Sequence, residues 1–259
     1  MPRFDSDGVG IVYDDFGEGR AAVMLHGFAS HRKHEWRGSG WDEALFDARR
    51  RFVAPDLRGH GESDKPDKPE VYSTDRHAAD VIRLIDHLKL DRVDLMGFSM
   101  GARIAAHLLI HHQDRFRSVV LAGIGGRLFG PPRDPQKMIQ AMLAPDPGAI
   151  EDPLAAMFRA FADEAGADRA ALAVATAAPR VPIAPEDFAK VEIPVLVLAG
   201  SRDQLAGDPQ PLADAIPGAK CAVISGAAHH ATISSPRAKP AVFEFWGLPP
   251  PAAQDRWRR

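Results

Sequence analysis

One serine stands in a pattern that is typical of a nucleophile. Residues 97–101 read Gly-Phe-Ser-Met-Gly, the pattern G-x-S-x-G with Ser99 at its centre. The apolar run 92–96 before it suits a buried strand, and residues 102–110 after it carry apolar side chains at helical spacing. A serine on such a strand-to-helix turn is exposed at the carboxyl end of a sheet, where helix N–H groups stabilise negative charge. The flanking glycines leave room where a Cβ would clash.

A serine hydroxyl becomes a good nucleophile when a base removes its proton and a carboxylate orients that base. On a strand–turn–helix scaffold the chain order of the three groups is serine, acid, histidine. The apolar run 195–199 ends just before Asp203, so we expect Asp203 to be the acid. Asp208 lies on the same loop and is the alternative.

Two adjacent histidines compete for the role of the base. The apolar run 222–224 leads through the small residues 225–228 to His229 and His230. The turn leads directly to His229, which position therefore favours as the base. His230 is then expected to pack beside it or to face solvent.

The oxyanion of an acyl-transfer reaction needs two hydrogen-bond donors. One is the N–H of Met100, directly after the serine, and the other is expected to be the N–H of Phe28, in the loop that follows Leu25. His26 is interpreted as a scaffold residue that holds this loop.

At these residues the chain resembles the α/β-hydrolase superfamily, and within it capped serine carboxylesterases. The matching segments are His26-Gly27-Phe28, Asp56-Leu57-Arg58-Gly59-His60-Gly61-Glu62-Ser63, Gly97-Phe98-Ser99-Met100-Gly101, Asp203 and His229. The resemblance implies a mostly parallel sheet of eight strands flanked by helices, with the triad Ser99, Asp203 and His229 beneath a helical cap. It also implies that residues 56–63 form a structural turn. Ala228 stands where many relatives carry glycine.

The rest of the chain reads as strands and helices that alternate, which indicates an α/β fold. We expect strands at 9–16, 21–25, 51–55, 93–97, 118–122, 195–199 and 222–224, and helices at 41–48, 74–88 and 100–112. The glycine-containing turn 17–19 joins the first two strands. The expected domains are a hydrolase core over 1–124 and 193–247, a helical cap over 125–192 and a flexible tail over 248–259.

The segment 125–192 has a different composition, with clustered prolines between helical pieces at 136–143, 153–164 and 168–177. Its large apolar side chains either line a substrate pocket or pack the cap helices together. These side chains are Met138, Met142, Leu143, Met157, Phe158 and Phe161.

A basic loop, 30–40, follows the oxyanion segment and is expected to border the entrance of the site. Its charged side chains include Arg32, Lys33 and Arg37, offset by Glu35. The loop either steers anionic substrates or is a solvated surface.

Composition adds constraints on location and partners. A net charge of −3 favours neither nucleic acid nor an anionic membrane as a partner, and no apolar stretch is long enough to span a bilayer. The single cysteine, Cys221, permits no internal disulfide and suits a small core residue. The first residues lack the apolar region of a signal peptide, so the expected location is the cytoplasm. The basic residues 256–259 read as part of a frayed tail.

The expected chemistry is hydrolysis of a carboxylic ester of small to medium apolar, or polymeric aliphatic, character through an acyl-enzyme, with no metal or organic cofactor. Hydrolysis of carbon–carbon bonds, perhydrolysis and acyl transfer use the same triad and stay open as alternatives. Epoxide hydrolases and haloalkane dehalogenases of the superfamily use an aspartate nucleophile, where this chain has Ser99. A non-catalytic ligand-binding module on the same fold is the alternative from another class. The sequence does not indicate an oligomeric state.

Overall fold

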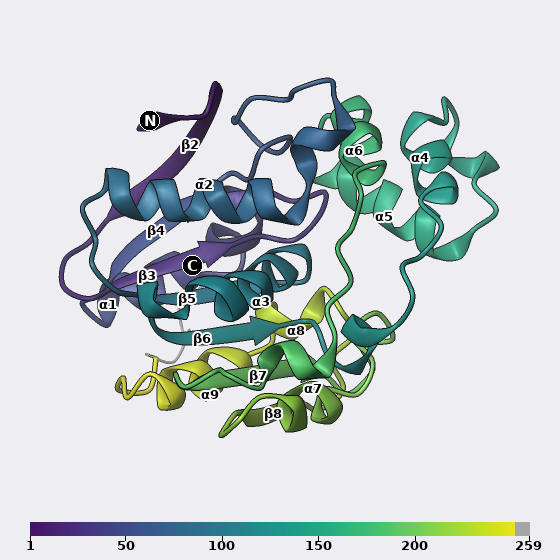
Figure 1. Ribbon diagram of the computed structural model, residues 1–259. Coiled ribbons are helices and arrows are strands. Elements are labelled where there is room, and N and C mark those ends of the chain that lie inside the picture. The colour runs from purple at the N-terminus through teal and green to yellow at the C-terminus, as the bar shows by residue number, and fades with distance from the viewer. Residues whose placement is uncertain (252–259) are drawn as a thin grey trace, which may run out of the picture.

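The computed structural model describes residues 1–251, in which a central sheet of eight strands runs through the molecule (Figure 1). The strands are β1 (Arg3–Ser6), β2 (Val9–Phe16), β3 (Ala21–Leu25), β4 (Arg51–Pro55), β5 (Val93–Phe98), β6 (Phe116–Ala122), β7 (Val195–Gly200) and β8 (Lys220–Ile224). Their order in the sheet is β1-β2-β4-β3-β5-β6-β7-β8. The pairs β1/β2 and β2/β4 are antiparallel, and every other pair is parallel. The mostly parallel α/β fold expected from the sequence is confirmed.

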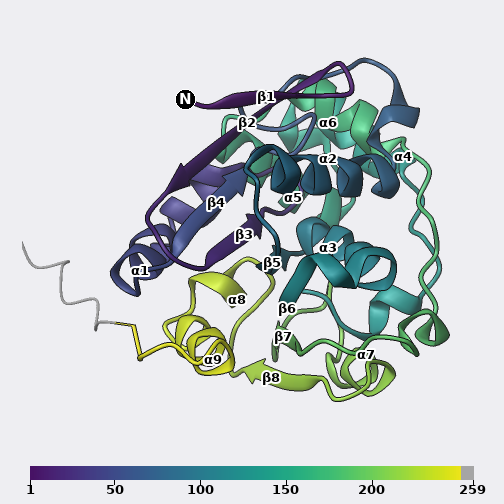
Figure 2. The ribbon, with the colours of Figure 1, turned by 60° about the vertical axis from the view of Figure 1, so that its left-hand side comes forward.

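Helices cover both faces of the sheet, because the buried strands are apolar on both sides. In β5, Val93 and Leu95 pack toward one face, while Met96 and Phe98 pack toward the other. The first face is covered by α2 (Thr74–His87), α3 (Met100–His112) and α7 (Gln210–Ala215). The second face is covered by α1 (Trp41–Asp47), α8 (Ala231–Ser234) and α9 (Ala238–Phe245), as the turned view in Figure 2 also shows.

A helical insertion lies between β6 and β7 and contains α4 (Gln136–Leu143), α5 (Pro153–Glu164) and α6 (Arg169–Thr176). The side chains of Asp152 and Asp168 cap α5 and α6 by accepting hydrogen bonds from backbone N–H groups in the first turn. Met142, Ala162 and Leu172 of the insertion form a small apolar cluster together with Ala29 of the loop after β3. In Figure 1 the insertion gathers at the end of the molecule toward which the arrow of β6 points. It therefore lies beyond the carboxyl ends of the parallel strands.

Short helical turns complete the described chain. They are a π-helical turn at Lys33–Arg37 and 3₁₀ turns at Pro69–Tyr72, Gln113–Arg115, Gly126–Phe129, Pro147–Ala149 and Pro185–Phe188.

The sequence did not predict every element. β1, α7, α8 and α9 were not expected, and β6 and β8 begin two residues earlier than the apolar runs indicate. The turn 17–19 does connect β2 to β3, but these strands are not paired, because β4 lies between them. A glycine-containing turn thus marks the end of β2 without forming a hairpin.

In residues 1–251 no helix combines the length and apolarity that a membrane crossing requires. Cys221 lies on β8, where it packs against the core but is only partly buried, not fully buried as expected. Burial raises the pKa of its thiol. Residues 252–259, with the basic segment 256–259, lie outside the described part of the chain.

Candidate active site

Ser99 occupies a strained backbone position between β5 and α3. Its φ is 52° and its ψ is −109°, a conformation that a residue with a Cβ rarely adopts. The two glycines of the motif make this turn feasible. A Cβ on Gly97 would lie 2.2 Å from the carbonyl oxygen of Gly101, and a Cβ on Gly101 would lie 2.2 Å from that of Leu25. Backbone strain that a fold maintains in this way is typical of a functional position.

Ser99, His229 and Asp203 form a continuous chain of hydrogen bonds. The Nε2 atom of His229 lies 2.9 Å from the Oγ of Ser99, and its Nδ1 atom lies 2.8 Å from the Oδ2 of Asp203. Such a chain can accept the serine proton at Nε2 while the carboxylate fixes the imidazole through Nδ1. The structure therefore brings together all three residues that the sequence selects, although 130 residues separate His229 from Ser99.

Backbone groups hold the carboxylate of Asp203 in place. Its Oδ1 atom accepts hydrogen bonds from the N–H groups of Leu205 and Ala206, at 3.0 and 2.9 Å, and its side chain is fully shielded from solvent. The alternative acid, Asp208, instead accepts a hydrogen bond from the N–H of Gln210 beside α7. Asp203 is thus the acid that contacts His229.

His230 has a different environment from its neighbour. Its ring stacks on Phe161 of α5 with 4.2 Å between the ring centroids. Neither ring nitrogen of His230 has a hydrogen-bond partner among residues 1–251. Burial, and then the neighbouring His229, lower the pKa of His230 to about 4. His230 packs beside the site, as expected.

The two expected oxyanion donors border the same cavity as Ser99. Met100 is the first residue of α3, so its N–H has no carbonyl partner within the helix. Phe28 lines the same cavity, and its ring contacts Phe158 of α5 edge-on. That its N–H is the second oxyanion donor stays a prediction.

The loop that carries Phe28 is tied to the core by His26. The Nδ1 atom of His26 donates to the carbonyl of Gly27 at 2.8 Å, and its Nε2 accepts a hydrogen bond from the N–H of Leu57 at 2.9 Å. Burial lowers the pKa of His26 to about 3, which keeps the ring neutral. A neutral ring has one nitrogen that donates and one that accepts, as these two hydrogen bonds require. The interpretation of His26 as a scaffold residue is confirmed.

Glu35 is a buried acid that the sequence analysis did not select. It is 7% exposed, and its Oε2 atom accepts the N–H of Gly27 at 3.0 Å, directly behind the turn that carries Phe28. Burial raises the pKa of Glu35, while the N–H of Gly27 and the nearby His229 oppose that rise. The sequence held no signal for this role, since Glu35 reads there as one more charge on a polar loop.

Replacing Glu35 by alanine is expected to lower kcat about tenfold or more, because the turn that carries Phe28 then shifts to relieve the unpaired N–H of Gly27, which costs about 1–3 kcal/mol if it stays buried without an acceptor. KM should change less than twofold, since Glu35 does not line the cavity. Glu35→Gln keeps an acceptor oxygen and should recover most of the loss. Steady-state kinetics on both variants, with Tm as a control for folding, distinguish this positioning role from a general loss of stability. Equal kcat in wild type and Glu35→Ala would contradict it.

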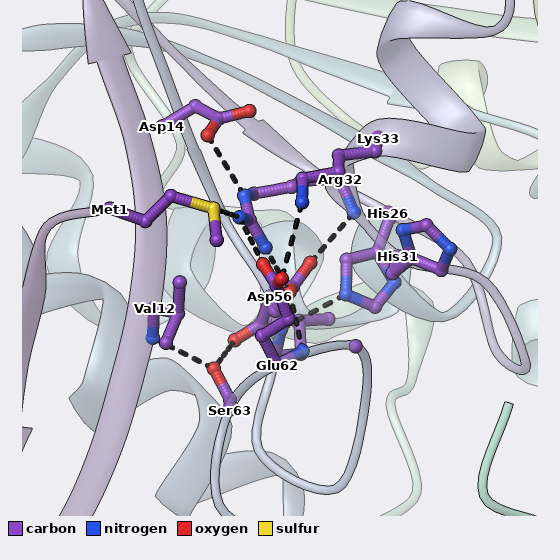
Figure 3. Close-up of polar contacts among 12 residues, drawn as sticks. Met1, Val12, Asp14, His26, His31, Arg32, Lys33, Asp56, Glu62 and Ser63 are labelled. Atoms are coloured by element: carbon purple, nitrogen blue, oxygen red, sulfur yellow. Dashed lines mark hydrogen bonds and ion pairs between the residues drawn. The ribbon is translucent and has the colours of Figure 1, made fainter.

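The cations of the basic loop pair with carboxylates of this protein. Arg32 is buried, and Figure 3 shows its guanidinium among the carboxylates of Asp14, Asp56 and Glu62. Lys33 also contacts Glu62, at 3.2 Å. The sequence left two roles open for this loop, anion steering and a solvated surface. Arg32 has neither role, because it is buried and three acids from distant segments neutralise it.

The turn 56–63 has the structural role that the sequence analysis gave it. Gly59 and Gly61 have φ values of +80° and +52°, and a Cβ on Gly61 would overlap the carboxylate of Asp56. Ser63 links the turn to β2 by accepting the N–H of Val12 and donating to the carbonyl of Asp56.

A cavity of about 790 Å³ opens onto Ser99 and His229. This size is within the range of small-molecule sites. Of the apolar insertion residues, Met138 and Phe158 line the cavity, whereas Met142 is buried in the small apolar cluster. Leu143 and Met157 are exposed, and Phe161 packs on His230. The large apolar side chains of the insertion thus have three different positions: some line the cavity, some pack inside the protein and some lie at its surface.

A metal site was not expected, and residues 1–251 contain no cluster of three or more His, Cys, Asp or Glu side chains arranged to hold a metal ion.

Two curated relatives illustrate how similarity is distributed along the chain. A putative 2-succinyl-6-hydroxy-2,4-cyclohexadiene-1-carboxylate synthase of Bacillus subtilis is 39% identical over 118 residues, which cover 45% of this chain and 41% of that protein. The chain therefore spans less than half the length of this relative. The 3-oxoadipate enol-lactonase 2 of Acinetobacter baylyi is 29% identical over 248 residues, 89% of this chain and 90% of that protein.

Other relatives are named epoxide hydrolases. Epoxide hydrolase 1 of Siraitia grosvenorii is 28% identical over 204 residues, 73% of this chain and 59% of that protein. Among solved structures, a hydrolase from Pseudomonas aeruginosa is 25% identical, covers 95% of this chain and 98% of its own, and superimposes with a TM-score of 0.77.

A family model described as the alpha/beta hydrolase fold matches residues 22–162, more than half of the chain. This segment contains Ser99 and the loop that carries Phe28. The chain therefore belongs to the α/β-hydrolase family.

Proposed function

We propose that this protein is a serine hydrolase that cleaves carboxylic esters of small molecules. The observation that carries the proposal is the hydrogen-bonded chain Ser99–His229–Asp203, which opens on a cavity large enough for an ester. The relatives, several of them named as hydrolases, support the general class of chemistry.

The proposed reaction follows from the positions of these groups. His229 takes the proton of Ser99 at Nε2 as the Oγ attacks the ester carbonyl, and the N–H groups of Phe28 and Met100 stabilise the oxyanion. His229 then gives that proton to the departing alcohol, which leaves an acyl group on Ser99. His229 then takes a proton from water as the water attacks the acyl-enzyme, and returns it to the Oγ of Ser99 as the acyl–oxygen bond breaks and the acid leaves. Asp203 stays ionised throughout and stabilises the imidazolium.

The helical insertion is proposed to act as a cap over this site, with the cap at 125–192 and the hydrolase core at 1–124 and 193–247. Met138 on α4 and Phe158 on α5 line the same cavity as Ser99. Since these side chains come from the insertion, a substrate must pass or displace it to reach the serine. The cap would then set the size and shape of accepted esters.

Cyclic esters are a second candidate class within the same chemistry. The relative that matches nearly the full length of this chain is named an enol-lactonase, and a lactone carbonyl can be attacked in the same way. Hydrolysis of a lactone would retain the alcohol on the acyl group, so that one product is released instead of two.

The proposed nucleophile separates this site from epoxide hydrolysis, which in this superfamily uses an aspartate at that position. Epoxide hydrolases of the superfamily also use tyrosines of the cap. Tyr72 lines the cavity but lies outside the insertion, and its hydroxyl donates to the carbonyl of Pro66 at 2.6 Å. We therefore propose ester cleavage. Carbon–carbon bond hydrolysis, perhydrolysis and acyl transfer stay alternatives that share its triad.

Turnover of p-nitrophenyl esters from acetate to laurate, together with γ- and δ-lactones of matched length, tests the proposal. We expect hydrolysis of short and medium esters and stoichiometric labelling of Ser99 by a fluorophosphonate. Labelling without turnover on any ester or lactone would redirect the search to the alternatives with the same triad. The absence of both would overturn the proposal and favour a ligand-binding module.

A further inference from the structure

The cavity wall away from the oxyanion loop is rich in positive charge. Five cationic side chains line the cavity, and two carboxylates do so. The cations are Arg103, Arg127, Arg133, Lys137 and Arg180, and the acids are Asp134 and Asp152. An ester with only apolar groups has no negative charge that these cationic side chains could bind.

The acids neutralise little of this charge. Asp152 pairs with Lys137 at 3.2 Å, and Asp134 accepts the N–H of Gln136 beside α4. Among residues 1–251, no carboxylate lies within 4.0 Å of the guanidinium groups of Arg103, Arg127, Arg133 or Arg180. Arg127, Arg133 and Arg180 are exposed to solvent and Arg103 is partly buried, so these four arginines bring positive charge without an acidic partner to the cavity.

Arginines elsewhere in this protein have acidic partners where they are buried. Arg50 pairs with Asp94, Arg58 with Asp80 and Arg159 with Asp163. This pairing is what the cost of burying an isolated charge requires. Arg103 differs, because no carboxylate among the described residues pairs with it, and its Nε atom, like the Nη1 atom of Arg50, is buried without a hydrogen-bond partner there.

Arg103 lies close to the proposed nucleophile. It stands one helical turn after Ser99 on α3, and its backbone N–H donates to the Ser99 carbonyl at 3.0 Å. Four residues of helix advance the chain by about 6 Å, comparable to the length of a six-carbon acyl chain. The guanidinium also donates to the carbonyl of Val181 at 2.6 Å, which holds the segment that carries Arg180.

The arginines also repel one another. The pKa of Arg103 lies below its ordinary value because of burial and the charge of Arg180. The pKa of Arg180 is lowered by burial and by Arg133 in turn. An anion between them would relieve this repulsion and supply the missing acceptors.

We propose that the site selects esters that carry a carboxylate, which Arg103 and Arg180 bind while the ester carbonyl lies at Ser99. This inference rests on the proposed ester hydrolysis and names the class of substrate. The cap then contributes a charged recognition site in addition to its apolar wall. The carboxylate of such a substrate, on either the acyl or the alcohol group of the ester, must lie several atoms from the ester carbonyl.

Chain-matched p-nitrophenyl esters test the inference: the monoesters of adipic and suberic acid against hexanoate and octanoate. We expect the wild type to show a kcat/KM at least about tenfold higher for the carboxylate-bearing member, with a ratio that falls as salt is added. Arg180→Gln and Arg103→Gln should each lower that ratio about tenfold. Arg180→Gln is the more informative variant if Arg103→Gln fails to fold.

Arg237→Gln is the matched control, since it removes the same charge from an exposed residue that does not line the cavity. It should leave the ratio unchanged; an equal fall would indicate steering by overall charge and would overturn the inference. Turnover of both esters with no preference would also overturn it and leave ester hydrolysis standing. If neither ester is cleaved, the test is whether adipate slows the labelling of Ser99 by a fluorophosphonate. Slower labelling in the wild type that is lost in Arg180→Gln supports the carboxylate site. Labelling of the wild type at the same rate with and without adipate rejects it.

Discussion

Ser99→Ala is expected to lower kcat for ester hydrolysis by at least about 10⁴-fold and to abolish fluorophosphonate labelling. Without the hydroxyl, no acyl-enzyme forms, and only transition-state binding by the oxyanion donors is left. That binding alone supports about 10³- to 10⁴-fold acceleration over water. KM should change little, since a hydroxyl contributes little to ground-state binding of an ester.

The fold should tolerate this change. Ser99 adopts its positive φ because Gly97 and Gly101 allow close backbone contacts, and alanine has a backbone preference similar to that of serine. Ser234→Ala, at an exposed serine, is the matched control and should keep full activity. Residual hydrolysis of Ser99→Ala above a tenth of the wild-type rate would mean that another group performs the reaction.

The local part of the site could be predicted because its geometry is local. The motif 97–101 sets its own turn through two glycines, whose contacts involve residues only a few positions away or on the adjacent strand. Asp203 and His229 could be placed because each follows a strand, and parallel strands end at one edge of the sheet. Strand order was harder to predict, since β4 enters between β2 and β3 only after 25 further residues of chain.

What could not be predicted depends on contacts across the sequence. Arg32 reads as an exposed loop cation until Asp14, Asp56 and Glu62 surround it. Glu35 reads as its counter-charge until the fold places it under the N–H of Gly27. Charge pairing decides which cations remain for a ligand, and pairing is a tertiary property. For this reason the uncompensated arginines appear at the cavity wall and not on the basic loop.

His229→Ala and His230→Ala form a pair that separates the two adjacent histidines. We expect His229→Ala to lower kcat by about 10⁴- to 10⁶-fold, because Ser99 loses the base and the departing alcohol loses its acid. Its reaction with a fluorophosphonate should slow in parallel, since labelling also needs an activated hydroxyl.

His230→Ala should lower kcat less than about tenfold. The pKa of His230 is about 4, so its ring is neutral at pH 7 and is not the imidazolium that a general acid requires, and no hydrogen bond connects it to Ser99 among the described residues. Its loss removes a ring that stacks on Phe161 of α5, which should affect KM for bulky esters more than kcat. A larger fall in kcat for His230→Ala than for His229→Ala would reverse the assignment. That result would require the ring of His229 to move away from Ser99 and Asp203 before the reaction. The hydrogen bonds of His229 to these two residues, at 2.9 and 2.8 Å, argue against such a movement.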